Sequence, residues 1–366
     1  MTVKYGLIGC GMMGMEHLRN IALLEGAELV AILEPNAAQR QLGLQNAPRA
    51  RAVESVSEMI SDAAIDAIVI ASPNHLHVAQ LKEIAGQAAL PILCEKPLFT
   101  GAEDEAEITR LQKHYPAPIW VAMEYRYMPP IAAFIERADN VTGGIKMLTL
   151  QEHRFAFLPK IGDWNRFNAQ TGGTLVEKCC HFFDLMRLIL NSEPIRVTAS
   201  ATQFVNHLDE TYDGKVPDIW DGGYVIFDFE NGAKAMLELS MFADGSKWNE
   251  EIHAIGPKGK IACRMPGPQR FWPADLGPSP QPELSLYPRA PKRPVTEIIE
   301  LDDALVEAGD HHGATFYQHQ KFLRMIQAGG RPDVTLEDGR LAVQMGLYAQ
   351  QAAETSRVIE FGAIDA

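Results

Sequence analysis

The chain has 366 residues, and at about 150 residues per domain this length predicts two domains rather than one small module. Hydrophobic residues make up 46% and charged residues 22%, which is typical of a globular protein and excludes a disordered or fibrous chain. With 33 Lys and Arg against 47 Asp and Glu, the net charge is −14, which disfavours nucleic acid as a partner.

The first third of the chain alternates between strand-like and helix-like segments. Short apolar runs predict strands, and segments of helical periodicity between them predict helices. The run at 65–71 is almost wholly apolar and β-branched, which is typical of a strand buried on both faces of a parallel sheet. The pattern predicts an α/β, doubly wound Rossmann domain over residues 1–122. Its expected strands are 5–8, 29–33, 65–71, 92–94 and 119–122, and its expected helices are 12–25, 37–44, 75–88 and 102–114.

Beyond residue 123 the expected strands follow one another directly. Asn231-Gly232 is a hairpin turn signal, and the pattern predicts an α+β domain over residues 123–366 with a large, mostly antiparallel open sheet. Residues 265–294 hold nine of the 23 prolines and are predicted to form a surface loop. The expected strands are 145–154, 195–204, 224–229, 233–240, 251–255 and 260–264. Helices are expected at 314–327 and 336–355, where they could pack back on the first domain.

A G-x-G-x-x-G sequence, Gly9-Cys10-Gly11-Met12-Met13-Gly14, separates the first strand from the first helix. Gly9 permits a tight turn, and Gly11 lets the backbone approach a pyrophosphate. Gly14 lets the helix pack closely on the strand, and the amides at the helix start, Met12 and Met13 among them, can bind phosphate. The motif predicts a dinucleotide site, whereas a structural turn with an incidental acidic neighbour is the alternative.

Glu34 lies 20 residues beyond Gly14, at the end of the second predicted strand. A carboxylate there can bind the ribose diol of NAD and would repel the 2′-phosphate of NADP. NAD is therefore the favoured cofactor. Arg40 could pair with a phosphate, so NADP stays open as the less favoured cofactor.

Further candidates follow the next two strands at the same edge of the sheet, where doubly wound proteins bind their ligands. Glu95-Lys96-Pro97 follows the strand at 92–94, so Lys96 is expected to enter the cofactor crevice, with Pro97 setting the turn. Ser72-Pro73-Asn74 ends the strand at 65–71. His77 either reaches the crevice or has a structural role. A solvated surface lysine is the alternative for Lys96.

Glu177 and His181 lie four residues apart in a segment that begins at Gly172 and is predicted to be helical to Asp184, so they share one face. Such a pair can bind a polyol and remove a proton, because histidine titrates near neutral pH. A solvated ion pair is the alternative. No metal is expected, since zinc needs three or four ligands and only these two are in register.

Together these motifs resemble the glucose–fructose oxidoreductase/inositol dehydrogenase (Gfo/Idh/MocA) family. The shared elements occur in order along essentially the whole chain, and Glu-Lys-Pro is the most specific of them. The resemblance implies an N-terminal Rossmann domain and a C-terminal open-sheet domain through which members form dimers or tetramers. The elements are the glycine motif followed by His17, residues 72–77, residues 95–97, residues 124–129 and residues 172–184.

The resemblance also implies a catalytic lysine, here Lys96, and an Asp-x-x-x-His pair on a helix. The histidine falls on His181, whereas Glu177 replaces the usual aspartate and is longer by one methylene. We therefore predict NAD-dependent oxidation of a secondary hydroxyl of a sugar, sugar derivative or cyclitol. His181 would take the hydroxyl proton, Lys96 would stabilise the oxygen, and Glu177 would hold a neighbouring hydroxyl or orient the base.

The remaining expected contacts surround this centre. Four cationic residues among them, Arg126, Arg154, Arg166 and Lys178, favour an anionic substrate. Cofactor contacts are expected from Gly9, Gly11, Met12, Met13, Gly14, Glu34, Ser72, Pro73, Asn74, His77, Glu95, Lys96 and Arg126. Substrate contacts are expected from Tyr125, His153, Arg154, Trp164, Asn165, Arg166 and Lys178.

Two other functions stay open. Some relatives are NAD-dependent glycoside hydrolases, which oxidise a hydroxyl transiently, eliminate the aglycone, add water and reduce the ketone again. The replacement at Glu177 keeps this reaction open, with an anionic glycoside as one substrate. A non-catalytic NAD-binding regulator is the third function.

Cysteine usage and the N-terminus predict a cytoplasmic protein. Five cysteines are few for this length, and the adjacent pair Cys179-Cys180 is a poor disulfide, so free thiols in a reducing cytosol are expected. No signal-peptide pattern precedes the first strand, and no run of about 18 apolar residues predicts a membrane helix.

Overall fold

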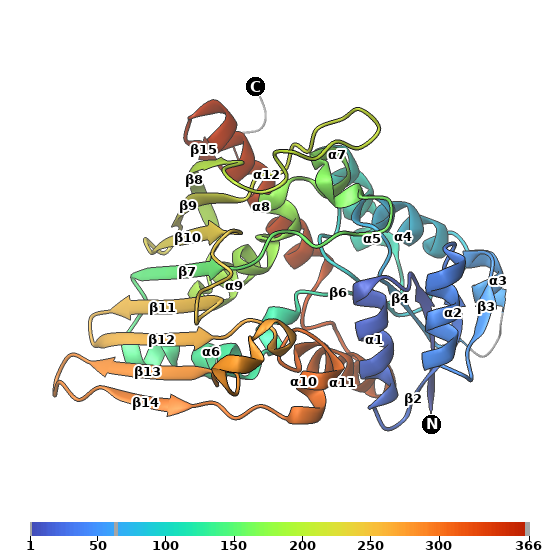
Figure 1. The fold of residues 1–366 in the computed structure, drawn as a ribbon, viewed down its shortest axis with the longest axis horizontal. Coiled ribbons are helices and arrows are strands. Elements are labelled where there is room, and N and C mark those ends of the chain that lie inside the picture. The colour runs from blue at the N-terminus through green and yellow to red at the C-terminus, as the bar shows by residue number, and fades with distance from the viewer. Residues whose placement is uncertain (1, 62–64, 363–366) are drawn as a thin grey trace.

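Two β-sheets carry the architecture (Figure 1), and the computed structural model describes residues 2–61 and 65–362. The first sheet has six parallel strands in the order β3-β2-β1-β4-β5-β6. The order reverses between β1 and β4, which defines a doubly wound sheet and confirms the predicted α/β class. The strands are β1 Val3–Ile8, β2 Ala27–Leu33, β3 Arg51–Val53, β4 Ala67–Ile70, β5 Ile92–Cys94 and β6 Ile119–Val121.

The helices of the first third follow the predicted alternation, with shifted ends. The first helix ends at residue 22 instead of 25, because the amides of Leu23 and Leu24 turn back to the carbonyls of Asn20 and Ile21. Strand β3 was not predicted, since its three residues include only a single buried apolar side chain. The helices are α1 Met12–Ala22, α2 Ala37–Asn46, α3 Val56–Ser61, α4 His77–Ala85 and α5 Glu105–His114.

The second sheet has nine strands in the order β14-β13-β12-β11-β7-β10-β9-β8-β15. Neighbours are antiparallel except β7 and β10, which confirms a mostly antiparallel sheet. The strands are β7 Met147–His153, β8 Pro194–Thr202, β9 Gly222–Phe229, β10 Lys234–Ser240, β11 Glu250–Gly256, β12 Gly259–Met265, β13 Glu283–Pro288, β14 Val295–Ile298 and β15 Ile359–Glu360.

The surface loop predicted for 265–294 was wrong in part, because residues 283–288 form strand β13 between β12 and β14. Prolines flank this strand rather than interrupt it, since Pro288 is its last residue. Leu284 is fully buried in the core. A proline-rich stretch can therefore supply a strand when its prolines lie outside the strand or at its end.

Helices cover one face of the second sheet and leave the other open. Inward positions along β7, such as Leu148 and Leu150, are buried, whereas Met147 is exposed. Tyr224 and Ile226 on β9 are exposed in the same way. Helices α6 and α12 pack against β12 and β8, respectively. They are part of the set α6 Pro129–Thr142, α7 Asn168–Thr171, α8 Thr174–Glu177, α9 Cys180–Leu190, α10 Asp303–Ala308, α11 Ala314–Ala328 and α12 Leu336–Thr355.

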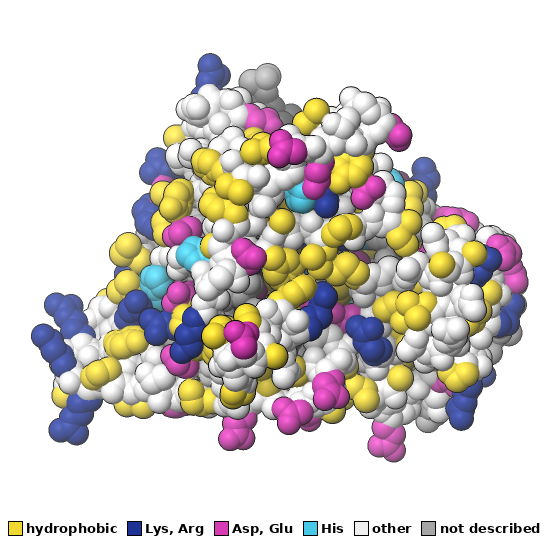
Figure 2. Space-filling model, viewed as in Figure 1, with side chains coloured by type: hydrophobic (Ala, Val, Ile, Leu, Met, Phe, Trp, Pro, Cys, Tyr) yellow, Lys and Arg dark blue, Asp and Glu magenta, His cyan; other side chains and the backbone are white. Residues whose placement is uncertain are grey.

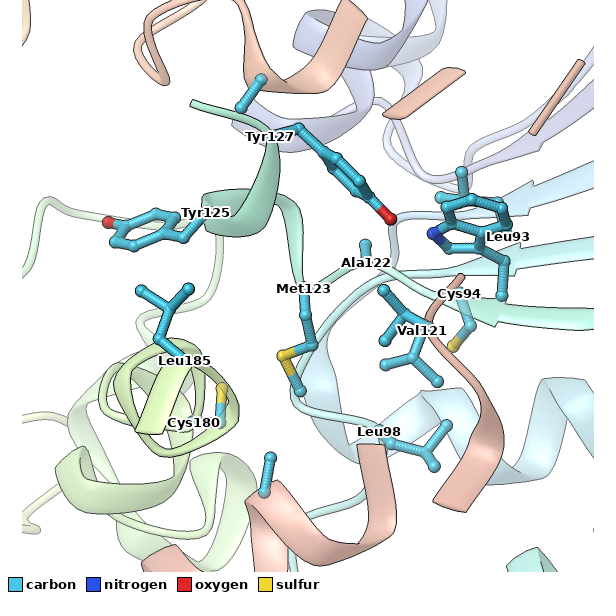
Figure 3. Close-up of a cluster of buried hydrophobic side chains, with 14 of the residues drawn as sticks. Leu93, Cys94, Leu98, Val121, Ala122, Met123, Tyr125, Tyr127, Cys180 and Leu185 are labelled. Atoms are coloured by element: carbon cyan, nitrogen blue, oxygen red, sulfur yellow. The ribbon is translucent and has the colours of Figure 1, made fainter. Parts of the chain in front are cut away.

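The last helices pack on the first sheet. Helix α11 lies against α1, and the ring of Phe322 lies 6.2 Å from that of Tyr5 and 6.1 Å from that of Trp120. Apolar side chains of β5 and β6 belong to the same buried cluster as those of α9, and Figure 3 shows Val121, Met123 and Cys180 in it. The core is therefore continuous, and the boundary at residue 122 stays a prediction.

Within residues 2–61 and 65–362, no helix combines the length and hydrophobicity of a membrane span.

Candidate active site

A cavity of about 1110 Å³ lies where the glycine-rich turn faces the second sheet. Figure 2 shows hydrophobic side chains near the centre of this face, between the two sheets of Figure 1. Phe155, Phe157 and Leu158, from the loop after β7, contribute an apolar wall. Ten of the predicted site residues also line the cavity: Gly11, Met12, Met13, Lys96, Tyr125, Arg154, Asn165, Glu177, Lys178 and His181.

The glycine-rich turn has the geometry that a pyrophosphate needs. Gly9 has φ +93°, and a Cβ there would lie 2.6 Å from the Ala71 carbonyl oxygen. A Cβ at Gly14 would lie 2.0 Å from the Gly9 oxygen, so helix α1 can lie this close to the turn only because residue 14 has no side chain. Gly11 instead has open space around it, and no side chain caps the first amides of α1. These residues fit a dinucleotide phosphate.

Glu34 closes the outer end of this turn. Its carboxylate is buried and accepts hydrogen bonds from the backbone amides of Cys10, at 2.7 Å, and Asn36, at 2.8 Å. The guanidinium of Arg40 donates to the Glu34 carbonyl at 3.1 Å and lies 3.7 Å from the carboxylate of Glu54. The turn is thus held around a carboxylate, and the nearby arginine already has partners.

Lys96 reaches the cavity from the end of β5. Its ammonium donates to the Glu177 carbonyl oxygen at 3.1 Å, and the Lys96–Pro97 bond is cis. His77 is fully buried, and its ring nitrogens contact the carbonyls of Pro97, at 2.8 Å, and Ser72, at 3.0 Å. These contacts give His77 the structural role, because they hold the turn that carries Lys96.

Glu95 points away from the cavity. Its carboxylate lies 2.8 Å from one ring nitrogen of His17, whose other nitrogen lies 2.8 Å from His319. Ser72 donates to Gln80 at 2.7 Å. The lining of the cavity therefore does not include the expected cofactor residues Ser72, Pro73, Asn74, His77 and Glu95.

The segment with Glu177 and His181 is two helices rather than the single predicted helix. Helix α8 ends at Glu177, and α9 begins at Cys180, because the amides of Lys178 and Cys179 both bond to the Thr174 carbonyl. The regular i, i+4 spacing is therefore lost. Both side chains nevertheless line the cavity.

His181 has the environment of a neutral base. Its ring stacks on Tyr125, with centroids 4.0 Å apart, and Nδ1 has no hydrogen-bond partner among the described residues. Burial holds the pKa of His181 well below its usual value, and the nearby charges of Lys96 and Lys178 lower it further. The imidazole is therefore uncharged at neutral pH.

The Glu177 side chain extends toward Lys160 in the loop after β7. One carboxylate oxygen lies 3.6 Å from the Lys160 ammonium, which sits 4.4 Å from the centroid of the Trp164 ring. The other oxygen is buried without a hydrogen-bond partner among the described residues. Glu177 thus has one ion-paired oxygen and one available oxygen.

Lys178 joins the cavity to the second sheet. Its ammonium donates to the Tyr125 hydroxyl at 2.6 Å and lies 2.8 Å from the Glu152 carboxylate. Burial and the charge of Arg154 lower the pKa of Lys178, against the effect of Glu152. Glu152 was not predicted, although strand alternation could have found it.

His153 lies on the opposite face of the sheet. Successive side chains of a strand point to opposite faces, so Glu152 is buried toward the cavity side while His153 lies 3.1 Å from Glu238 on the open face. The expected substrate contact of His153 is not supported.

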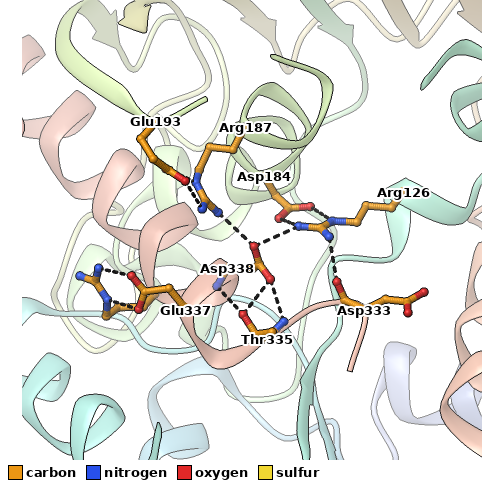
Figure 4. Close-up of polar contacts among 9 residues, drawn as sticks. Arg126, Asp184, Arg187, Glu193, Asp333, Thr335, Glu337 and Asp338 are labelled. Atoms are coloured by element: carbon orange, nitrogen blue, oxygen red, sulfur yellow. Dashed lines mark hydrogen bonds and ion pairs between the residues drawn. The ribbon is translucent and has the colours of Figure 1, made fainter. Parts of the chain in front are cut away.

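Arg126 likewise points away from the cavity. Figure 4 shows its guanidinium bound to the carboxylate of Asp184, and it also donates to the Asp333 carbonyl at 3.1 Å. The expected cofactor contact of Arg126 is therefore not supported. Arg166 is buried against Glu210 at 3.0 Å, and Trp164 is a neighbour of the cavity rather than part of its lining.

These pairs remove the argument for an anionic substrate. Arg126 pairs with Asp184, Arg166 with Glu210, and Lys178 with Glu152. Arg154 lies 3.5 Å from Glu152 as well. The cationic residues that favoured an anion thus neutralise carboxylates of the protein itself.

A second buried cluster borders the cavity beside helix α1. His311 lies 2.8 Å from the carboxylate of Glu16 and 3.5 Å from that of Glu124, and the Thr315 hydroxyl oxygen lies 2.7 Å from the first carboxylate and 2.6 Å from the second. The three possible ligand atoms lie within 4.8 Å of one another. Burial alone would lower the pKa of His311, but the carboxylates of Glu124 and Glu16 raise it to about 9. A protonated His311 between the two carboxylates fits these contacts.

A glycine-rich turn at the switch point of a doubly wound sheet, opening on a lysine, a histidine and a glutamate, defines a dinucleotide-dependent oxidoreductase. Residues 3–123 match the family described as "Oxidoreductase family, NAD-binding Rossmann fold", and residues 138–361 match its "C-terminal alpha/beta domain". The chain belongs to the Gfo/Idh/MocA oxidoreductase family, which confirms the predicted resemblance.

Individual members of the family share low sequence identity with this chain. The rhizopine catabolism protein MocA of Rhizobium meliloti is 27% identical over 278 residues, which cover 74% of this chain and 80% of that protein. An inositol 2-dehydrogenase of Corynebacterium glutamicum is 28% identical over 273 residues, 74% of this chain and 76% of the relative. The structure of a levoglucosan dehydrogenase with NADH has a TM-score of 0.81 at 18% identity, covering 98% of this chain and 99% of the other.

Proposed function

We propose that the protein oxidises a secondary hydroxyl of a sugar or polyol, with NAD as the hydride acceptor. The supporting observation is that Lys96, Glu177 and His181 line one cavity with the glycine-rich turn. A neutral base and a cation beside a dinucleotide site suit the removal of a proton and a hydride from an alcohol.

The chain's own residues would move the proton and stabilise the charge. His181 accepts the hydroxyl proton, since burial and the nearby cations keep it neutral. Lys96 binds the same oxygen and stabilises negative charge as the proton leaves. NAD, when bound, would accept the hydride from the carbon that carries this hydroxyl, so the alcohol would become a ketone. Glu177 accepts a hydrogen bond from a neighbouring hydroxyl through its available oxygen.

We propose NAD rather than NADP as the cofactor because of Glu34. Its buried carboxylate is held at the end of β2 beside the turn, where it favours a ribose diol and repels a 2′-phosphate. The arginine that kept NADP open, Arg40, is bound to the Glu34 carbonyl and lies near Glu54.

A cyclitol or pyranose is the substrate class that we propose, because two of the similar proteins carry names of inositol or rhizopine metabolism. NADH formation at 340 nm with myo-inositol, scyllo-inositol, hexoses and anhydrosugars tests this directly. Stoichiometric NADH with a free polyol is expected. Aglycone release from a glycoside with no net NADH would instead indicate the glycosidase, and NAD binding with neither reaction would indicate a regulator.

We also propose that two or more copies associate through the open face of the second sheet. Met147, Tyr224 and Ile226 expose about half or more of their surface there, and exposed apolar side chains of this kind favour association. Light scattering on the purified protein should give the mass of a dimer or tetramer. We further propose a cytoplasmic location, in keeping with five buried cysteines that form no disulfide.

A further inference from the structure

Glu250 is a buried carboxylate that the proposed chemistry does not use. It begins strand β11, is 5% exposed, and lines the same cavity as His181. The side-chain amide of Asn249 donates to one of its oxygens at 2.9 Å. The other oxygen, Oε2, has no hydrogen-bond partner among the described residues.

Its surroundings do not explain why a carboxylate is kept there. Glu250 pairs across the sheet with Glu152, so two acids face the same side at adjacent positions. The ion pairs of the nearby cations are with the other acid, since Lys178 lies 2.8 Å and Arg154 3.5 Å from Glu152, and at Glu250 their charges offset only part of the effect of burial. Burial and the charge of Glu152 raise the pKa of Glu250 to about 7. This residue therefore costs stability, since a buried acceptor without a donor is unfavourable.

The next residue shows what an ordinary position on this strand looks like. Glu251 points to the other face, and its carboxylate lies 2.8 Å from Arg264. Glu250 has no such partner, and its free oxygen is buried at a cavity wall. Most buried acceptors in native proteins have donors, and a hydroxyl of a molecule bound in the cavity would supply the one that is missing here.

We propose that Glu250 is a specificity residue, which binds a substrate hydroxyl other than the one that is oxidised. The inference rests on the proposed function and deepens it, because it assigns a second recognition point on the polyol. A polyol that lacks this hydroxyl, or carries it with the opposite configuration, leaves the carboxylate unpaired in the complex. Such a compound is bound poorly even though its reacting hydroxyl is intact.

The test compares Glu250→Gln and Glu250→Ala with the matched control Glu251→Gln. The probe is myo-inositol with NAD, or whichever cyclitol or pyranose of the same set gives NADH with the parent enzyme. At about pH 8.5, where the Glu250 carboxyl group is ionised, KM should rise about 10-fold in Glu250→Gln and about 100-fold in Glu250→Ala, because a charge-assisted hydrogen bond is lost. The kcat should stay within about three-fold, since the bond contributes equally to the ground state and the transition state. The control should match the parent.

Mono-deoxy analogues of the probe then identify the hydroxyl. The parent should bind one analogue about 100-fold more weakly than it binds the probe. Glu250→Ala should bind that analogue as well as the parent does, because the hydrogen bond that the substitution would remove is already absent. The other analogues should show independent losses. The melting temperature of the ligand-free Glu250→Gln protein should equal or exceed that of the parent, which a purely structural role would not allow.

Each outcome decides a separate question. If the parent makes no NADH with any compound of the set, the proposed function fails and this inference falls with it. If the parent is active but the Glu250 variants keep its KM, or lose activity only by unfolding, the inference fails while the proposed function stands. A loss in kcat alone would also overturn it.

Discussion

The imidazole of His181 lies flat on the phenol ring of Tyr125, with centroids 4.0 Å apart and planes 5° apart. The Tyr125 hydroxyl is held by the Lys178 ammonium at 2.6 Å, which in turn lies 2.8 Å from Glu152 on β7. The orientation of the proposed base therefore depends, through Tyr125 and Lys178, on Glu152 of the second sheet. Tyr125 comes from the segment that links the two sheets, so this stack also joins them.

Removing the Tyr125 ring should misplace the base without removing it. Tyr125→Ala is expected to lower kcat about 10- to 100-fold, because a displaced general base loses its reach to the hydroxyl. Tyr125→Phe keeps the stack and should stay within about five-fold of the parent in kcat. Steady-state kinetics with saturating NAD measures both. Equal losses in the two variants would show that the hydroxyl, rather than the stack, is what matters.

The proposed chemical roles of Lys96 and His181 predict inactive proteins that still bind the cofactor. His181→Asn and Lys96→Met should each lower kcat/KM about 100- to 10,000-fold, since general base catalysis and charge stabilisation supply about that much. The dissociation constant for NADH, measured by fluorescence, should change by no more than a few-fold. Parent-like activity in either variant would contradict the site assignment.

Glu34 should control the choice of dinucleotide. Glu34→Ser removes the carboxylate that favours the ribose diol and repels a 2′-phosphate, so the NADP-to-NAD ratio of kcat/KM should rise about 10- to 100-fold. Because the carboxylate also binds the amides of Cys10 and Asn36, a melting curve has to accompany the kinetics. The control is Glu28→Gln, which lies on the same strand and pairs with Arg49 rather than Arg40, and its ratio should not change.

The His311 cluster predicts a pH-dependent contribution to stability. The folded-state pKa of His311 is raised to about 9, above its ordinary value, because the carboxylates of Glu124 and Glu16 outweigh burial. The stabilisation is therefore fully present below about pH 6.5 and is lost as the pH rises through 9. His311→Asn should cost about 1–3 kcal/mol of unfolding free energy at pH 6.5 and much less at pH 10.

Urea unfolding of the parent and His311→Asn across this range measures the difference. The groups that face His311 are Glu16 on α1, Glu124 between the sheets, and the cation of Lys178 across the cavity. Comparison at each pH cancels the titration of groups that both proteins share. A difference that is constant or grows toward pH 10 would exclude a protonated His311 between the two acids.

Arg126 should be a structural residue. Arg126→Ala leaves the buried Asp184 without its partner and should cost about 3–5 kcal/mol, because an unpaired buried charge is strongly unfavourable. The control Arg196→Ala removes an exposed arginine from Asp228, which keeps its ion pair with Lys234, and should cost at most about 1 kcal/mol. Urea unfolding measures both. In the folded Arg126 variant the NADH dissociation constant should be unchanged, and a large rise would restore the cofactor role.

Local patterns were sufficient for the features that depend on neighbours in the chain. The alternation of apolar runs and helical segments predicted the parallel sheet, and Gly9, Gly11 and Gly14 predicted the turn that faces the cavity. Lys96 was placed correctly at the cavity because the end of a strand in a doubly wound sheet has a known position. The interrupted helix after Gly173 was not predicted, since the choice of Cys179 to bond to Thr174 has no signature in the sequence.

The sequence by itself determined the fold class, the glycine-rich turn and the candidates Lys96, Glu177 and His181, because each follows from residue type and spacing within one segment. Only the tertiary structure decided which cations are already paired, as for Arg126 with Asp184 and Lys178 with Glu152. It also brought Glu250, from a strand far along the chain, to the wall of the cavity. These depend on contacts between distant segments, and burial there sets both the charge state and the partner of each group.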